Sequence, residues 1–373
     1  MAVKVNSSEL AKKLEQVVKV VSNKNVIQIL ADVMIEVRGN VVVLTASDSE
    51  IWLSVKCPLI EDAQEAKFCV NARDFVELIK NINDREIVMS IDTESCRLLC
   101  DYGNGNFSMP YDDASEFPMP NTEDETPKSI IVEGEKIMRA IELTSFAVGN
   151  STIRPIMNGI HFNFSEDGMV VSATNTHKVA VYKDKSINGG NMGDFVLPKK
   201  PSSILLSILA LENDNVKISF GGSAISVNNT NFKMSARLLE GRFFDCESLT
   251  SAVRPISVTI DKGLALQALK RVMPMTSELS NLVVLFFEQG KVNITADNSM
   301  FGKSASETVV CDCDSELRIG FKCSDLIELF KNIEDDNLVM EMANPMGGVV
   351  VYASSAYSRD EYVSLLASSE LNQ

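Results

Sequence analysis

Two segments that lie 251 residues apart read almost alike and constrain the fold more than any other feature. They are VNARDFVELIKNINDREIVMSI from Val70 and FKCSDLIELFKNIEDDNLVMEM from Phe321, and nine of 22 aligned positions are identical. A more diverged copy, LPKKPSSILLSILALENDNVKISF from Leu197, lies between them. Each copy predicts an extended entry, a helix with apolar positions three and four residues apart, and an alternating strand. The chain is therefore built from repeated units.

A second set of segments alternates with the first. VKVNSSELAKKLEQVVKVV begins at Val3, SIIVEGEKIMRAIELTSFAV at Ser129 and SVTIDKGLALQALKRVMPM at Ser257, with spacings of 126 and 128 residues. Each predicts a short strand, a polar helix start and an amphipathic helix. Pairs of alternating strands follow, with turns expected at 38–40, 166–168 and 289–291. Together the two sets predict helices within 8–21, 71–83, 133–148, 198–210, 261–275 and 322–333.

The repeats predict three units of about 125 residues, each made of two similar halves. We place the domains at 1–125, 126–255 and 256–373, because the acidic, proline-containing stretch 112–129 and the stretch 249–257 are typical of boundaries. Alternating strands with one buried face predict an α+β fold, with helices on one face of antiparallel sheets. Such repeats can record gene duplication alone, but even spacing favours a curved or closed arrangement.

Composition is that of an ordinary globular protein, with 45% hydrophobic and 23% charged residues. No apolar run approaches the roughly 18 residues that span a bilayer, so no membrane partner is expected. The N-terminal MAVKVNSSEL has no apolar core of a signal peptide, which favours a cytoplasmic location. The eight cysteines are scattered, mostly inside apolar runs, so we expect reduced core residues rather than disulfides.

The net charge of −16 argues against a simple basic nucleic-acid binder, but the charge is unevenly distributed. The six helical windows hold 14 basic and 10 acidic residues, so the helices are net positive while the remainder is strongly acidic. Helix surfaces are ordinarily rich in Lys and Glu, which is one explanation. The other is that the helices face a polyanion. Sparse Lys and Arg without aromatic residues fit sequence-independent contact with duplex phosphates.

No motif indicates catalysis. The sequence has no P-loop, no G-x-S-x-G, no H-E-x-x-H and no CxxC pair, and its only histidines are His161 and His177. Cys311 and Cys313, and Cys96 and Cys100, have no neighbouring His that would complete a metal site. We therefore expect neither an enzyme nor a cofactor.

Several local segments resemble the bacterial sliding clamp family, the DNA polymerase III beta subunits. LTASDSEIWLSV is similar to the family's L-T-x-T-D-L-E, and NGIHFNF with VSATNTHKVAVY resembles N-G-x-x-F and A-T-D-G-H-R-L-A. ARLLEGRFFDCESL resembles K-L-V-D-G-R-F-P-D-Y, and VNARDF resembles P-A-R-x-F. The resemblance runs from about residue 1 to 365. It implies three tandem clamp domains of the processivity fold, each with two inner helices and outer antiparallel sheets.

The resemblance also implies a function. Two chains would close head to tail into a ring around double-stranded DNA, without sequence preference, and tether a replicative polymerase. The clamp loader, repair polymerases and ligase would bind the same ring through short apolar peptide motifs. The residues that would face DNA are Lys24, Arg73 and Arg154, with the inner-helix residues Lys12, Lys80, Lys136, Arg139, Lys199, Lys200, Lys270 and Lys331.

The family's pocket for partner peptides maps onto the second and third units. It would comprise Met157, Thr174, Thr176, His177, Lys178, Val179, Phe244, Ser248, Leu249, Met346, Ala367, Ser368 and Ser369. Thr176, Phe244 and Ser248 stand where the family often has Gly, Pro and Arg, and the tail SLLASSELNQ replaces an M-P-M-like ending. Residue chemistry alone favours a structural histidine at His177 over a functional one. The tail predicts peptide binding weaker by one or two decades, because each buried apolar side chain contributes about 1.5–3 kcal/mol, unless the tail is frayed and the pocket is built differently.

The ring interface would pair an edge of the first unit with one of the third. The matching residues are Phe107, Met109, Pro274 and Met275, which could equally be core residues of their own domains. Two other functions remain open. One is a divergent clamp-like scaffold with an altered pocket that no longer serves the main polymerase, and the other is an enzyme, which the sequence supports poorly.

Overall fold

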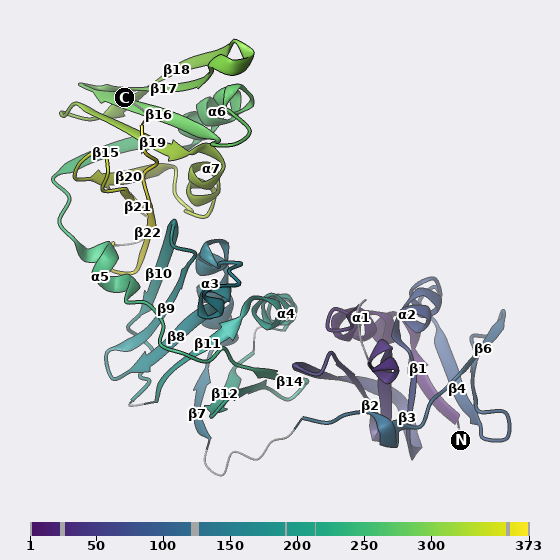
Figure 1. Ribbon diagram of the computed structural model, residues 1–373. Helices are drawn as coiled ribbons and strands as arrows, with labels where there is room; N and C mark the ends of the chain where they lie inside the picture. Colours follow the sequence, from purple (N-terminus) through teal and green to yellow (C-terminus); the bar gives the residue numbers. More distant parts are fainter. Residues whose placement is uncertain are drawn as a thin grey trace. The chain divides into compact units, whose positions relative to one another are not determined.

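The computed structural model describes residues 2–22, 27–120, 127–190, 192–212, 214–355 and 359–371 (Figure 1). The chain divides into two compact units by its internal contacts. Unit 1 contains Met1–Glu135 and Ser203–Leu238, and unit 2 contains Lys136–Ser202 and Leu239–Gln373. Among the described residues, no helix is both long and apolar enough to cross a membrane.

Unit 1 holds two antiparallel sheets. The first has strand order β1-β4-β5-β6 and the second β2-β3-β14-β13-β12-β7. The elements of this unit are β1 (Ala2–Asn6), α1 (Ser7–Val17), the 3₁₀ helix η1 (Gln28–Ala31), β2 (Asp32–Ser47), β3 (Ile51–Asn71), α2 (Ala72–Lys80), β4 (Glu86–Asp92), β5 (Arg97–Asp101), β6 (Asn106–Pro110), η2 (Ala114–Glu116), β7 (Lys128–Val132), β12 (Val216–Gly221), β13 (Ala224–Asn228) and β14 (Phe232–Arg237).

Unit 2 is built on one large antiparallel sheet, with strand order β11-β8-β9-β10-β22-β21-β20-β15-β18-β17-β16-β19. Its strands are β8 (Gly159–Ser165), β9 (Gly168–Thr174), β10 (Lys178–Asp184), β11 (Gly193–Pro198), β15 (Ile256–Asp261), β16 (Leu282–Glu288), β17 (Lys291–Asn298), β18 (Lys303–Asp312), β19 (Leu317–Lys322), β20 (Asn337–Met342), β21 (Val349–Ala353) and β22 (Tyr362–Leu366).

The helices of unit 2 connect these strands. They are α3 (Gly134–Thr144), η3 (Ser145–Ala147), η4 (Pro155–Asn158), α5 (Cys246–Ser251), α6 (Lys262–Val272), η5 (Met273–Met275), η6 (Ser299–Phe301) and α7 (Cys323–Lys331). A further helix, α4 (Lys199–Leu209), begins in unit 2 and ends in unit 1.

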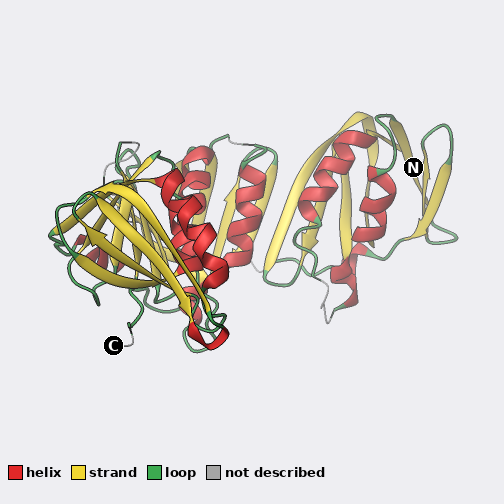
Figure 2. Cartoon of the chain, turned by 90° about the horizontal axis from the view of Figure 1, so that it is seen from above, coloured by secondary structure: helices red, strands yellow, loops and turns green. Residues whose placement is uncertain are grey.

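The repeated helices bury one apolar face, and polar side chains cap the starts of α1, α2 and α6. Asn6 caps α1 by accepting hydrogen bonds from the N–H groups of Ser8 and Glu9, and Asp261 caps α6 through Leu264 N–H. The buried faces include Leu10 and Leu14 of α1 and Phe75 of α2. In unit 1, α1 packs against α2, and both contact β2 and β3, so the two helices lie side by side against the strands (Figure 2).

All six predicted helices are present, and the fold class is confirmed. The turns expected near 166–168 and 289–291 also form, between β8 and β9 and between β16 and β17. The domain boundaries at 125/126 and 255/256 stay a prediction.

The turn expected at 38–40 is wrong. β2 continues through Gly39, because Val37 pairs with Ala66 and Val41 with Pro58 of the same long strand β3. The strand pairing is irregular on both sides of Gly39, whose φ is 57°. The residues that favour a turn therefore form a bulge within β2. A second difference is α5, whose last residues fall in the stretch 249–257 that was predicted as a domain boundary.

Candidate functional site

A tight turn between β9 and β10 presents polar side chains at the surface of unit 2. Asn175 Oδ1 accepts hydrogen bonds from His177 N–H (3.0 Å) and Lys178 N–H (2.8 Å), and Thr174 Oγ1 accepts one from Thr176 N–H (3.2 Å). Thr176 has a φ of 77°, a left-handed conformation that explains why a Gly would be suited to this position. The turn leaves Thr176 and His177 exposed, while Thr174 is buried.

The C-terminal segment packs beside this turn. Strand β22 pairs with β10, and beyond it Ala367 N–H donates to the carbonyl of His177 (2.7 Å). Ser369 N–H donates to the carbonyl of Gly320 in β19 (2.8 Å). A Cβ at Gly320 would lie 2.7 Å from Leu371 Cδ2 and 3.1 Å from the carbonyl oxygen of Ser369, so the missing side chain leaves room for the tail to pack closely. The tail as far as residue 371 is therefore held in place, and it is not frayed.

An apolar cluster lies beneath the turn, on the face of the sheet that α5 covers. Its buried members are Val179, Val181, Val196, Phe243, Cys246, Val350 and Val363. The ring of Phe243 stacks on His161, with 4.8 Å between centroids, and His161 Nε2 lies 2.9 Å from Asp194 Oδ2. Asp245 caps the start of α5 by accepting a hydrogen bond from Ser248 N–H (3.0 Å). The cluster thus fixes the segment that carries Phe244 and Leu249.

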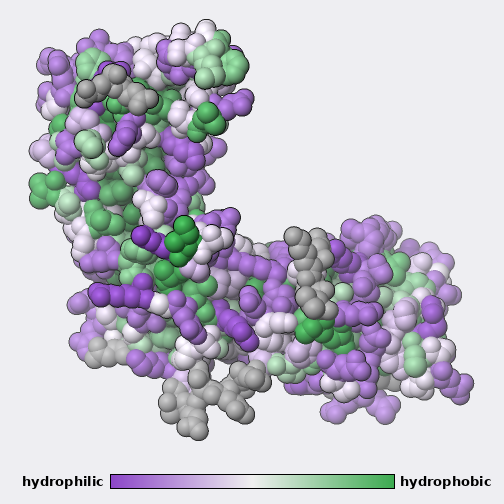
Figure 3. Space-filling model, viewed as in Figure 1, coloured by the Kyte–Doolittle hydropathy of each residue, from purple (hydrophilic) through white to green (hydrophobic). Residues whose placement is uncertain are grey.

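Three large apolar side chains of the predicted peptide pocket remain at the surface. Phe244 is 36% exposed, Leu249 51% and Met346 81%, although most large apolar residues of the unit are buried. Hydrophobic residues gather on the visible surface around β10 and β22 (Figure 3). Exposed apolar side chains around a rigid, polar-rimmed turn are typical of a protein-binding surface.

The remaining predicted pocket residues divide by burial. Met157, Lys178 and Val179 are buried, Ser248 is exposed, and Ala367, Ser368 and Ser369 are half-buried. Lys178 is 6% exposed, and its Nζ lies 2.5 Å from Glu328 Oε2 and 3.6 Å from Asp325 Oδ1 of α7. A buried lysine with two carboxylates is a fixed structural link, so Lys178 joins β10 to α7 and positions the turn.

Arg154 lies next to Phe244 at this site. Its guanidinium carbon is 5.8 Å from the centroid of the Phe244 ring, a cation–π distance. The family resemblance predicts that Arg154 contacts DNA. Phe243, a member of the apolar cluster, and Ile156, which packs against it, were not predicted. No short motif marks them; the adjacent pair Phe243-Phe244 was the available signal.

The predicted DNA-facing residues are mostly exposed on helices. Lys12 is on α1, Arg73 and Lys80 are on α2, Lys199 and Lys200 begin α4, Lys270 is on α6 and Lys331 is on α7, and all seven are exposed. Lys136 and Arg139 on α3 are half-buried. Lys24 lies outside the described residues.

Several of these cations have partners. Lys12 pairs with Glu9 (2.9 Å), Lys80 with Glu77 (2.5 Å) and Arg139 with Glu334 (2.9 Å), while Lys136 donates to Ser186 Oγ (2.9 Å). Water screens exposed pairs of this kind, so they are weak and can exchange one anion for another easily. The helix surfaces are suited to weak, replaceable contacts with phosphates.

Strands β6 and β18 each have an edge that is unpaired along most of its length within the described residues. β6 pairs only with β5, and its other edge meets no strand among the described residues. β18 pairs with β17 over residues 303–310, whereas β15 contacts only its last two residues, Cys311 and Asp312. Open edges are ready to pair with another chain.

Apolar residues adjoin both open edges. Next to β6, a groove of about 410 Å³ is lined by Leu78, Ile82 and the half-buried Phe107, while Met109 is buried. Next to β18, η5 exposes Pro274, with Met275 half-buried.

The cysteine thiols are free and mostly buried. All eight cysteines are free and all but Cys96 are buried, and burial raises the pKa of Cys57, Cys69 and Cys100 to about 12. In the part of the chain that the structure describes, no group of three or more His, Cys, Asp or Glu side chains could hold a metal ion.

Comparison with known proteins gives consistent matches along the whole chain. Three family models of the DNA polymerase III beta subunit match in order: the N-terminal domain at residues 1–121, the central domain at 131–245 and the C-terminal domain at 254–364. The beta sliding clamps of Staphylococcus epidermidis and Staphylococcus aureus are each 24% identical over 342 and 343 residues, which cover 89% of this chain and 90% of theirs.

Solved structures share the fold. The DNA polymerase III subunit beta of Pseudomonas aeruginosa matches with a TM-score of 0.92 at 22% identity, and the beta subunit of Thermotoga maritima with 0.90 at 18%. A Pseudomonas aeruginosa sliding clamp bound to griselimycin matches with a TM-score of 0.93 at 23% identity. Each match covers 100% of both chains, which shows a fold of three tandem clamp domains.

Proposed function

Since the chain belongs to the family of the DNA polymerase III beta subunits, the non-catalytic bacterial sliding clamps, we propose that two copies close head to tail into a ring around duplex DNA. The observation that carries this proposal is the match of three successive family models, which together run from residue 1 to 364. A ring retains its cargo by topology, so it needs no strong or sequence-specific contact with DNA.

The open strand edges support the closure of such a ring. β6 of one copy would pair with β18 of the other, which removes the unpaired backbone groups of both edges. The exposed Pro274 and the half-buried Met275 would enter the groove that Phe107 and Leu78 line. An apolar centre flanked by strand pairing is the usual anatomy of a stable subunit interface.

Contact with DNA is assigned to the basic residues of the repeated helices. Arg73 and Lys80 on α2 are exposed, and Lys80 forms an exposed ion pair with Glu77 that phosphate can replace. Such side chains suit transient phosphate contacts that allow sliding. Arg154 would contact DNA only by leaving the ring of Phe244. Lys24 and the other cations named above remain candidates.

Partner proteins are assigned to the surface around Phe244, Leu249 and Met346. A short peptide with an apolar side chain would gain buried area there, and the carbonyls and amides of the β9–β10 turn would orient it. We infer that the replicative polymerase, the clamp loader, repair polymerases and ligase share this surface. Replication of bacterial DNA takes place in the cytoplasm, and we propose that location for the chain.

Retention on DNA tests the ring directly. The chain is loaded onto nicked circular DNA by the clamp loader of its own cell, and the bound fraction is followed by gel filtration. We expect retention in high salt on circular DNA and rapid loss after linearisation, because only topology resists salt. Retention that is the same on circular and linear DNA would overturn the proposal.

Two variants separate topology from contact. Arg73→Glu should shorten the lifetime on circular DNA at low salt, whereas Arg318→Glu, which reverses an exposed charge on strand β19, should not. A divergent scaffold predicts a different pattern, in which the ring is retained on DNA but does not stimulate its host's replicative polymerase.

A further inference from the structure

The chain builds the same strand junction twice. In unit 2, β10 pairs with β22, from Lys178 with Leu366 to Tyr182 with Tyr362. In unit 1, β3 pairs with β14 in the same antiparallel sense, from Ile51 with Ala236 to Val55 with Phe232.

The turns before the two junctions also match, hydrogen bond by hydrogen bond. Ser49 has a φ of 76°, as Thr176 has 77°. Asp48 Oδ1 accepts from Glu50 N–H (3.1 Å) and Ile51 N–H (2.8 Å), in the manner of Asn175. Arg237 N–H donates to the carbonyl of Glu50 (2.9 Å), just as Ala367 N–H donates to His177. The β3–β14 junction is therefore a structural copy of the candidate peptide site.

The surfaces of the two junctions differ. Across β10, β22 and β21, the directly opposed residues Val179, Leu365 and Val350 are apolar, and α5 packs against them. Across β3, β14, β13 and β12, the corresponding row is Trp52, Ser235, Ser226 and Ser219. Among the described residues no helix covers this row, and a cleft of about 810 Å³ lies over it.

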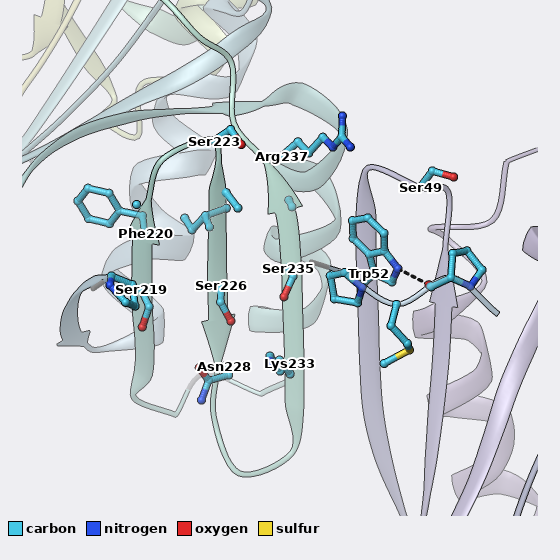
Figure 4. A pocket seen from close by; sticks show the side chains of 18 residues that line it. Ser49, Trp52, Ser219, Phe220, Ser223, Ser226, Asn228, Lys233, Ser235 and Arg237 are labelled. Atoms are coloured by element: carbon cyan, nitrogen blue, oxygen red, sulfur yellow. Dashed lines mark hydrogen bonds between the residues drawn. The ribbon is translucent and has the colours of Figure 1, made fainter. Parts of the chain in front are cut away.

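The cleft has a polar floor, an apolar wall and two cations. Figure 4 shows Ser219, Ser226 and Ser235 side by side on adjacent strands, with Trp52 beside them. Trp52 Nε1 donates to the carbonyl of Pro118 (2.8 Å), which fixes the indole against the wall that Pro118 and Met119 complete.

The charged side chains among the described lining residues are basic. Lys233 and Arg237 line opposite ends of the cleft and are exposed, and neither has an ion pair within the described part of the chain (Figure 4). No Asp or Glu is among the described lining residues, although the net charge is −16.

We propose that this cleft is a second docking site, which binds a short acidic peptide of a partner protein with one apolar side chain against Trp52. Lys233 and Arg237 would pair with its carboxylates, and the serine hydroxyls would bond its backbone. Two cations suffice for a peptide with a few carboxylates, whereas the acidic remainder of the chain would repel a continuous nucleic-acid backbone. The inference rests on the proposed function, because a ring that tethers partners gains from a second contact on each copy.

Trp52 supplies a local reporter, since it is the only tryptophan of the chain. The probe is a pool of short acidic peptides, each with one Leu, Met or Phe between carboxylates, titrated into the intact protein while Trp emission is recorded. We expect saturable change in emission that salt weakens. A control pool with Gln and Asn in place of Glu and Asp should leave the emission unchanged.

Matched variants locate the binding. Arg237→Glu and Lys233→Glu should each weaken binding by about tenfold or more, because each places like charges together. Lys185→Glu should leave it unchanged. Ser226→Tyr, which fills the floor without altering charge, should abolish it.

Phe244→Ala distinguishes the two peptide sites. Unchanged Trp52 titration in this variant supports a separate site, whereas loss of the response with Phe244→Ala but not with Arg237→Glu would overturn the proposal. Absence of any saturable response to the acidic pool would overturn it too. Retention on circular DNA is measured in parallel, so failure of the ring and failure of the cleft remain distinct results.

Discussion

At the level of single residues, the state of the cysteines was predictable from the sequence, whereas ion pairs between distant elements were not. The cysteines were expected to be free core residues; all eight are free, and all except Cys96 are buried. Lys178 was expected at a peptide pocket by resemblance, yet its ammonium group lies against Glu328 and Asp325, far away in sequence. Such an ion pair across two elements leaves no local signal in the sequence.

Asp32 makes the stability of unit 1 depend on pH. It is 6% exposed at the start of β2, and burial together with the neighbouring Asp112 raises its pKa from 3.8 to about 7. The folded state therefore holds this proton more tightly than the unfolded chain does. The contribution of protonated Asp32 to the free energy of unfolding is fully present below about pH 4 and is lost as pH rises through about 7.

Asp32→Asn should remove this dependence. We expect the variant to be more stable than the parent chain at about pH 8, by about 1–3 kcal/mol, and to lose the advantage near pH 4. Urea unfolding followed by the emission of Trp52, which lies in the same unit, measures the difference. Asp314→Asn, at an exposed position, is the control, and an equal gain at all pH values would show that Asp32 does not titrate in this range.

Phe244 should dominate peptide affinity at the unit 2 site. Phe244→Ala removes an aromatic face that is 36% exposed before binding, and we expect binding of a short apolar peptide to weaken by about tenfold, since burying such a ring contributes about 1.5–3 kcal/mol at most. Isothermal titration measures the affinity. Leu211→Ala removes an exposed apolar side chain in unit 1 and should have no effect; equal losses in both variants would remove Phe244 from the site.

At the level of elements, periodicity identified the helices and strand alternation identified most hairpins. The six repeated helices were predictable because each buries one apolar face behind a polar start, as Phe75 in α2 and Leu326 in α7 illustrate. Gly39 shows the limit of turn chemistry: the same residues that favour a hairpin can be absorbed as a bulge when both flanks pair with one long strand. α5 was missed because six residues are too few for a periodic pattern.

The site at the β9–β10 turn was predictable only through resemblance. The sequence of residues 367–371 does not predict that Ala367 and Ser369 donate hydrogen bonds to the carbonyls of His177 and Gly320, since both acceptors lie far away along the chain. Conversely, the likeness of the turns at Ser49 and Thr176 depends on local Asx chemistry and is visible in the paired segments ASDSEI and ATNTHK. The hydrogen bonds of the two turns are alike because their sequences are alike, whereas the elements that pack on the adjoining strands differ.

At the level of the whole molecule, pairing between the open edges of β6 and β18 predicts a particular symmetry. A head-to-tail ring joins β6 of each copy to β18 of the other, so its interfaces are heterologous and use two different surfaces. A symmetric contact would instead join Phe107 to Phe107. Light scattering should give about twice the 40.9 kDa of one chain for the unmodified protein.

Two charge insertions distinguish these arrangements. Phe107→Arg or Met275→Arg alone should yield monomers, because every head-to-tail interface then contains one buried cation. Mixing the two variants should restore a dimer, because one of its interfaces combines the unmodified Phe107 side with the unmodified Met275 side. Leu211→Arg, outside both edges, should stay dimeric. If the mixture remains at the mass of one chain while each variant is folded, the copies do not meet head to tail through these edges.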